Sequence, residues 1–194
     1  EMKKNRLFIL LTFLPLFLST YADNLGHISN IGDLSNNSIE SLYQDHKGQL
    51  WIGTCDGLNA FNGRDIYIYR PTDNNKRLSG NIIDNILETT NNTLWVQTYH
   101  GLNKIERITQ DVTHYNDFNE SLLMLKDTCN TLFVLQQNNF IEYYNEEKRM
   151  FQTTELRNVI FKNILCTTID ANNNLWTVSS TGEIKSFKIT YSEN

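Results

Sequence analysis

Prolines, cysteines and surplus basic charge are all scarce in this chain of 194 residues. Its two prolines exclude a proline-rich linker. A formal net charge of −5 gives no electrostatic reason to expect nucleic-acid binding, because phosphate recognition relies on basic patches. The three cysteines, Cys55, Cys129 and Cys166, are spaced irregularly and form no C-x-x-C pair. We therefore expect no metal site, and we expect these cysteines to be buried free thiols.

Sustained helical periodicity and a membrane-spanning hydrophobic run are also absent. The apolar run at residues 7–18 covers 12 residues, fewer than the roughly 20 that a membrane-spanning helix needs. It follows Lys3, Lys4 and Arg6 and precedes small residues that end at Ala22, an order typical of an export signal. We predict a signal peptide over residues 1–22 and a mature chain outside the cytoplasm. An uncleaved N-terminal anchor is the alternative.

A repeated motif organises the rest of the chain. One aromatic column recurs at spacings of 44, 38 and 43 residues, the length of a β-propeller blade, and it consists of Trp51, Trp95, Phe133 and Trp176. The residue before each aromatic is always leucine, namely Leu50, Leu94, Leu132 and Leu175. Stacking of the aromatic column between neighbouring blades explains its period better than a row of sugar-binding rings does.

Turn residues recur at fixed distances from the aromatic column. Six residues before it stand Asp45, Thr89, Asp127 and Asp170. Three residues before it stand Gly48, Asn92, Asn130 and Asn173, residue types that accept positive φ in a tight turn. The Asp column invites comparison with the paired carboxylates of glycoside hydrolases, but aspartate at this place is expected to bond its own turn.

Between these turns lie short apolar runs that predict four-stranded antiparallel meanders. In the first copy, the predicted strands cover residues 39–44, 50–54, 58–61 and 66–69. The predicted fold class is an all-β propeller segment over residues 23–194, with blades at about 36–72, 80–116, 119–154 and 161–194. We favour an arc of a larger propeller over a closed four-blade ring, in which residues 24–34 would supply a closing strand.

The first two copies resemble the repeats of two-component-regulator propellers. The resemblance rests on residues 45–54 (DHKGQLWIGT), on the Gly-Leu-Asn that begins at Gly57, and on the corresponding residues of copy two. It implies the periplasmic sensor region of a Bacteroidetes hybrid histidine kinase, anchored in the inner membrane, that detects glycan fragments and regulates polysaccharide utilisation. Further blades and signalling domains of a parent protein would then be partners of this segment.

No catalytic constellation is evident, so we expect this segment to be a non-enzymatic binding module without a cofactor. Loops between blades and between second and third strands are the expected site for an oligosaccharide. They carry Asn37, Asp56, Asn81, Tyr99, His100, Gln137 and Asn138. Among these, Tyr99 and His100 form the preferred pair, because large side chains interrupt a simple turn there. One alternative is a propeller enzyme, either a polysaccharide lyase or a glycosidase, and the other is a protein-binding scaffold. Self-association into a homodimer is also expected.

Overall fold

The structure is a computed structural model and describes residues 34–71, 77–90, 92–118, 121–136, 141–154, 156 and 163–190. The described strands form four antiparallel sheets, three with four strands and one with three, so the predicted all-β class is confirmed. The predicted signal peptide lies outside the described residues, as does the predicted closing strand apart from Leu34. Within the described part, no helix has the length and apolarity needed to cross a bilayer.

Each sheet is a meander in which consecutive strands pair. The first sheet contains β1 (Ile39–Gln44), β2 (Leu50–Thr54), β3 (Gly57–Phe61) and β4 (Ile66–Tyr69). The second contains β5 (Ile83–Thr90), β6 (Thr93–Thr98), β7 (Gly101–Glu106) and β8 (Asp111–Tyr115), followed by the short 3-10 helix η3 (Asn116–Phe118). The third contains β9 (Ser121–Lys126), β10 (Leu132–Gln136), β11 (Ile141–Asn145) and β12 (Met150–Thr153). The last contains β13 (Ile164–Ile169), β14 (Asn174–Ser179) and β15 (Ile184–Lys188).

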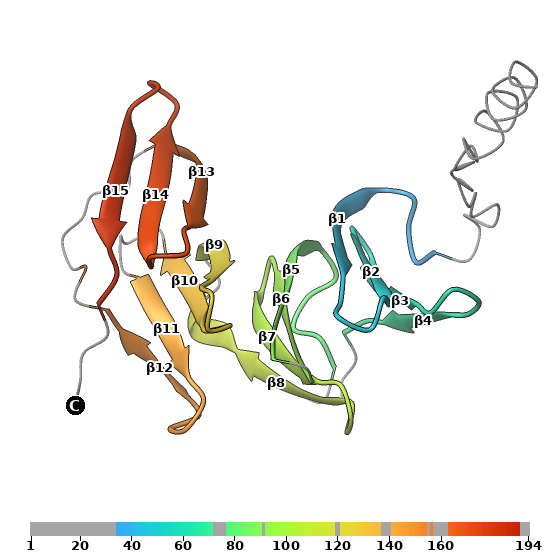
Figure 1. Cartoon of the computed structure of the whole chain (residues 1–194). Coiled ribbons are helices and arrows are strands. Elements are labelled where there is room, and N and C mark those ends of the chain that lie inside the picture. Colours follow the sequence, from blue (N-terminus) through green and yellow to red (C-terminus); the bar gives the residue numbers. More distant parts are fainter. Residues whose placement is uncertain are drawn as a thin grey trace, which may run out of the picture. The chain divides into compact units, whose positions relative to one another are not determined.

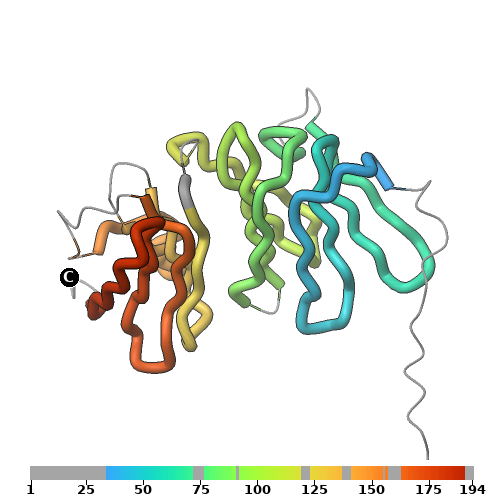
Figure 2. The backbone as a smooth tube through the Cα atoms, turned by 90° about the horizontal axis from the view of Figure 1, so that it is seen from above, coloured from blue at the N-terminus to red at the C-terminus, as the bar shows by residue number. Residues whose placement is uncertain are grey.

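Consecutive sheets pack against each other through their first strands. Strand β5 contacts β1 and β2, β9 contacts β5, and β13 contacts β9. Figures 1 and 2 show the sheets in chain order, from the blue first sheet to the red last one. Three hydrophobic clusters form the core, and each of them joins residues of two consecutive sheets. The core therefore lies between the sheets, as expected for repeats that cannot bury both faces alone.

The aromatic column supplies the largest residues of these clusters. Trp51, Trp95 and Phe133 are at most 2 % exposed, and each packs with residues of the sheet that follows its own. Trp176 differs, because 40 % of its surface is exposed and none of the described sheets covers it. Within the described residues, three members of the column therefore pack between consecutive sheets.

The Asp column makes the predicted turns. One carboxylate oxygen of Asp45 accepts the backbone N–H groups of Lys47 and Gln49 at 2.9 and 3.0 Å. Asp127 and Asp170 make the same pair of bonds, and Gly48, Asn130 and Asn173 have the predicted positive φ. The second copy has Thr89 instead, and its strands pair as far as Thr90 and Thr93. The aspartate that accepts two backbone N–H groups in the other three copies is thus replaced by threonine in this one.

The predicted burial of the three cysteines is wrong. All three are free thiols, but Cys129 and Cys166 are exposed and Cys55 is only partly buried. Cys129 lies in the turn between β9 and β10, and Cys166 lies on β13 beside Val178, on the same face as Trp176. These two thiols lie outside the core, because a turn tip and the uncovered face of a sheet are both in contact with solvent.

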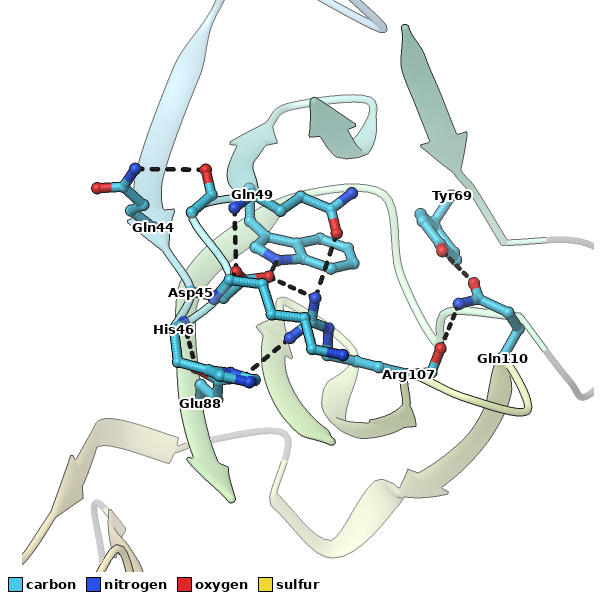
Figure 3. Close-up of polar contacts among 11 residues, drawn as sticks. Gln44, Asp45, His46, Gln49, Tyr69, Glu88, Arg107 and Gln110 are labelled. Carbon is cyan, nitrogen blue, oxygen red and sulfur yellow. Dashed lines mark hydrogen bonds and ion pairs between the residues drawn. The ribbon is translucent and has the colours of Figure 1, made fainter. Parts of the chain in front are cut away.

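A buried polar network, here called the Arg107 network, joins the first two sheets at the ends of the strands that carry the Asp45 turn (Figure 3). The Arg107 guanidinium lies 2.7 Å from the Asp45 carboxylate and 3.1 Å from Glu88. Glu88 also accepts the backbone N–H of His46 at 2.9 Å and lies 2.7 Å from its Nδ1. The network therefore links a turn of the first sheet to the ends of β5 and β7.

Candidate functional site

The candidate site lies at the opposite strand ends, where a leading segment comes before the first strand of each sheet. Residues 34–38 lead into β1, and residues 78–82 lead into β5. In the second copy, the side-chain oxygen of Asn103 accepts the backbone N–H of Ser79 at 2.8 Å, and its amide donates to the Ser79 hydroxyl at 3.0 Å. The Ser79 hydroxyl also lies 2.9 Å from that of Thr98. These bonds hold the leading segment against the β6–β7 turn.

The first copy repeats this network atom for atom. Asn59 accepts the Ser35 N–H at 2.8 Å and donates to the Ser35 hydroxyl at 2.8 Å, while Thr54 takes the place of Thr98. Copies three and four have Ile141 and Ile184 at the asparagine position, so they cannot form it. These residues were not among the predicted binding residues. The signal that could have revealed them is the pairing of Leu-Ser before β1 and β5 with Gly-Leu-Asn at β3 and β7.

Tyr99 and His100 form the turn between β6 and β7. The Tyr99 N–H donates to the carbonyl of Ile82 at 3.2 Å, and the His100 N–H donates to the Thr98 hydroxyl at 3.3 Å. The two rings meet edge to face, with centroids 5.3 Å apart and an interplanar angle of 85°. Despite this contact, Tyr99 is 66 % exposed. The backbone is thus held firmly while most of the Tyr99 ring stays open to solvent.

A pocket of about 470 Å³ opens beside this pair. The first sheet contributes Cys55 and Pro71, and the second sheet contributes residues 79–82 together with Tyr99 and His100. The Gly57 N–H donates to the carbonyl of Asn81 at 2.8 Å, which ties the two sides of the pocket together. The pocket therefore contains a polar leading segment, an imidazole and an exposed aromatic ring at the junction of two sheets.

The absence of a side chain at Gly80 lets the leading segment lie close to the β6–β7 turn. A Cβ atom placed on this residue would lie 2.9 Å from the Thr98 hydroxyl oxygen and 3.2 Å from Cδ2 of His100. Any larger residue would push the leading segment away from the β6–β7 turn. The close approach of the two backbone segments thus depends on a glycine at this position.

The structure brings together three of the predicted binding residues, Asn81, Tyr99 and His100. Asp56 lies outside this pocket lining, and its carboxylate is paired with the Arg70 guanidinium at 2.9 Å. Asn37 is exposed and also lies outside the lining. Gln137 and Asn138 are not among the described residues. The candidate site is therefore narrower than the predicted set.

A second, larger hollow of about 820 Å³ lies between the second and third sheets. Its floor includes Lys104, whose ammonium lies 3.1 Å from Glu106, 3.4 Å from Glu146 and 4.7 Å from the centre of the Tyr144 ring. Burial opposes the Lys104 charge, but the hydrogen bond to Glu106 and the nearby carboxylates outweigh it and raise its pKa. Burial and the hydrogen bond to Tyr144 raise the pKa of Tyr115. The buried charge is already compensated by its neighbours, which favours a structural role for this hollow.

Metal ligation has no support in the described ranges. No group of three or more His, Cys, Asp or Glu residues gathers there in a way that could hold an ion. What the 470 Å³ pocket offers instead is hydrogen bonding from amide, hydroxyl and imidazole groups and a surface for ring stacking.

Comparison with known proteins connects this architecture with bacterial signalling. Residues 33–56 match the family model described as the two component regulator propeller. Histidine kinase P4 of Formosa agariphila is 42 % identical over 64 residues, which is 32 % of this chain and 5 % of that protein. The resemblance noted in the sequence is thus confirmed.

Solved structures show the same fold. The extracellular domain of a protein described as a hybrid two component system of B. thetaiotaomicron matches with a TM-score of 0.64 and 19 % identity, over 83 % of this chain and 25 % of that one. The extracellular domain of a one component system of the same organism matches with a TM-score of 0.60 and 25 % identity, over 80 % and 25 %. The chain thus has a β-propeller fold and spans about a quarter of each of these domains.

Proposed function

We propose that this chain is a ligand-sensing propeller segment of a two-component signalling protein, located outside the cytoplasm, and that the pocket at Tyr99 binds an oligosaccharide. The family match over residues 33–56 and the similarity to a histidine kinase support the signalling role. The similarity to extracellular domains supports a periplasmic location, with the parent protein anchored in the inner membrane and carrying the kinase.

One observation carries the ligand proposal, the 66 % exposure of the Tyr99 ring beside the pocket. An exposed aromatic face stacks on the apolar face of a sugar ring, while amide and imidazole groups bond its hydroxyls. Asn81 and His100 stand beside Tyr99 in the lining and supply those groups. A glycan fragment fits this combination better than an apolar ligand does.

The position of the pocket suggests how binding would be signalled. Because Cys55 and Pro71 come from the first sheet and the other lining residues from the second sheet, a bound ligand touches both. Ligand binding would favour one arrangement of the two sheets over others, and this shift would pass to neighbouring domains or protomers.

The test is calorimetric titration of the purified chain with neutral and with uronic-acid oligosaccharides. Replacing Tyr99 by alanine should weaken binding at least about tenfold, which corresponds to roughly 1.4 kcal/mol. Tyr67, which is 58 % exposed on β4 and outside the pocket lining, provides the matched control, and Tyr67→Ala should leave binding unchanged. Equal effects of the two substitutions, or no binding by the chain, would contradict the proposal and favour the scaffold alternative.

A further inference from the structure

The described lining of the pocket at Tyr99 offers an anionic ligand no cationic partner at the ends of long side chains. It contains thiol, hydroxyl, amide, imidazole and aromatic groups, but no lysine, arginine, aspartate or glutamate. Proteins recognise carboxylate and sulfate groups chiefly through guanidinium and ammonium groups, which form charge-assisted hydrogen bonds with them. The charge around the pocket is therefore set by residues behind its lining.

A carboxylate stands directly behind one wall of the pocket. Glu40 accepts the Cys55 thiol at 3.1 Å and the Ser38 hydroxyl at 3.1 Å, both through Oε1. Because Cys55 is part of the lining, a ligand atom that touches its sulfur lies no more than roughly 7 Å from that oxygen. This separation is shorter than the Debye length of about 8 Å at physiological ionic strength, so repulsion between two negative charges would be felt there.

A second carboxylate lies close to the first. Asp84 is on β5, just after the lining residue Ile82. Burial raises the pKa of Asp84, and the negative charge of Glu40 raises it further. Since like charges disfavour each other only at short range, the two carboxylates lie near one another. Strands β1 and β5 thus both bring negative charge to the neighbourhood of the pocket.

The arginines that come before the lining residues are engaged elsewhere. Arg70 precedes Pro71, and its guanidinium pairs with the Asp56 carboxylate at 2.9 Å and donates to the Asp56 carbonyl at 3.0 Å. The charge of Arg77 acts on Tyr69 of β4, where it opposes the rise in pKa that burial causes. The charged side chain that contacts the Cys55 side chain is therefore a carboxylate.

We propose that the pocket at Tyr99 binds neutral oligosaccharides in preference to anionic ones, and that Glu40 is a residue that determines this selectivity. The inference rests on the proposed function, because it names the ligand class of the same pocket. An oligouronate carries a carboxylate on every ring, so it cannot occupy the pocket without bringing one of them near Glu40. Because Glu40 is exposed to solvent, the repulsion is modest, and we expect uronates to bind about three- to tenfold more weakly.

Glu40→Gln tests the proposal, because glutamine keeps an oxygen that can accept hydrogen bonds from Cys55 and Ser38 but has no charge. Calorimetric titrations would use neutral gluco-, manno- and galacto-hexasaccharides and hexauronates. The unmodified chain should prefer a neutral probe, and Glu40→Gln should reduce this preference about threefold. Glu147→Gln is the control, since it removes the same charge from an exposed residue between β11 and β12, outside the pocket lining.

Salt provides a second measurement that needs no substitution. Raising the salt concentration to about 0.5 M should reduce the preference of the unmodified chain, because screening weakens the repulsion by Glu40. Three results would overturn this inference and leave the proposed function standing. They are a hexauronate that binds the unmodified chain as tightly as the neutral probes do, a preference that salt does not change, and equal effects of Glu40→Gln and Glu147→Gln. Binding of none of the probes would overturn both proposals.

Discussion

The Arg107 guanidinium of the second sheet lies 2.7 Å from the Asp45 carboxylate of the first sheet, and both side chains are almost fully buried. The same carboxylate oxygen accepts the indole N–H of Trp51 at 2.8 Å. One aspartate therefore closes a turn, orients the largest core side chain and pairs with the neighbouring sheet. The other sheets have no arginine at the position of Arg107, since Gly63, Asn145 and Lys188 stand there.

Replacing Arg107 by alanine should lower the free energy of unfolding by about 3–5 kcal/mol, because it leaves the Asp45 and Glu88 carboxylates buried without their partner. Urea denaturation measures this change. Arg70→Ala is the control, because its pair with Asp56 is 44 % and 39 % exposed and should be worth no more than about 1 kcal/mol. Similar losses in both variants would mean that burial of the pair has no special effect.

The indole bond can be tested with phenylalanine, which removes the N–H donor and keeps a smaller aromatic ring. Trp51→Phe should cost about 1–3 kcal/mol in urea denaturation, because Asp45 loses a hydrogen bond in a buried site. Trp176→Phe makes the same change beside Asp170, where the tryptophan is 40 % exposed and water can replace the lost bond. A larger loss for Trp176→Phe than for Trp51→Phe would contradict this account.

Asp170 should titrate at unusually low pH. Hydrogen bonds from the Trp176 indole, from the Asn174 side chain and from backbone N–H groups hold its pKa well below the ordinary value of 3.8. Because the folded-state pKa is lowered, the stability that this carboxylate contributes is present above its unfolded-state pKa and is lost as the pH falls through the folded-state pKa. Carbon-detected NMR titration should show the low pKa in the unmodified chain and a higher one in Trp176→Phe. An unchanged pKa in the variant would assign the effect to the turn alone.

Asn103→Ala should loosen the pocket and lower stability by about 1–3 kcal/mol, since the fully buried Asn103 bonds the leading segment at Ser79 and the carbonyl of Val96. Hydrogen exchange should rise at residues 79–82 and 99–101. Asn62→Ala is the control, because Asn62 also caps a turn, by accepting from Arg64 and Asp65, but is exposed. Unchanged exchange at Ser79 would show that the leading segment is held by other contacts.

The fold could be predicted because its signals are local. An aspartate and a residue of positive φ determine a turn within five residues, and an alternating apolar run between two turns can only form a strand. The same turn and strand pattern recurs in the other copies, which strengthened the prediction, and the bounds of β1 and β2 in the first sheet were predicted to the residue. Three residues of the candidate pocket lining, Asn81, Tyr99 and His100, were singled out from the sequence, because they lie in a loop where an aromatic such as Tyr99 is conspicuous.

The remaining features depend on distant residues. The pairing of strands and the order of neighbouring sheets decide three of these features. They bring Arg70 to Asp56 and Arg107 to Asp45, and they leave Cys166 and Trp176 facing solvent. Column positions alone cannot show this, because Trp51 and Trp176 have the same local sequence role and differ only in whether a sheet covers them. The sequence by itself determined the repeat, which is read from spacing along the chain, and the turns and the all-β class, which rest on neighbours within one hairpin. Burial, charge pairing and the pocket were decided only by the tertiary structure, because each needs side chains from two different sheets.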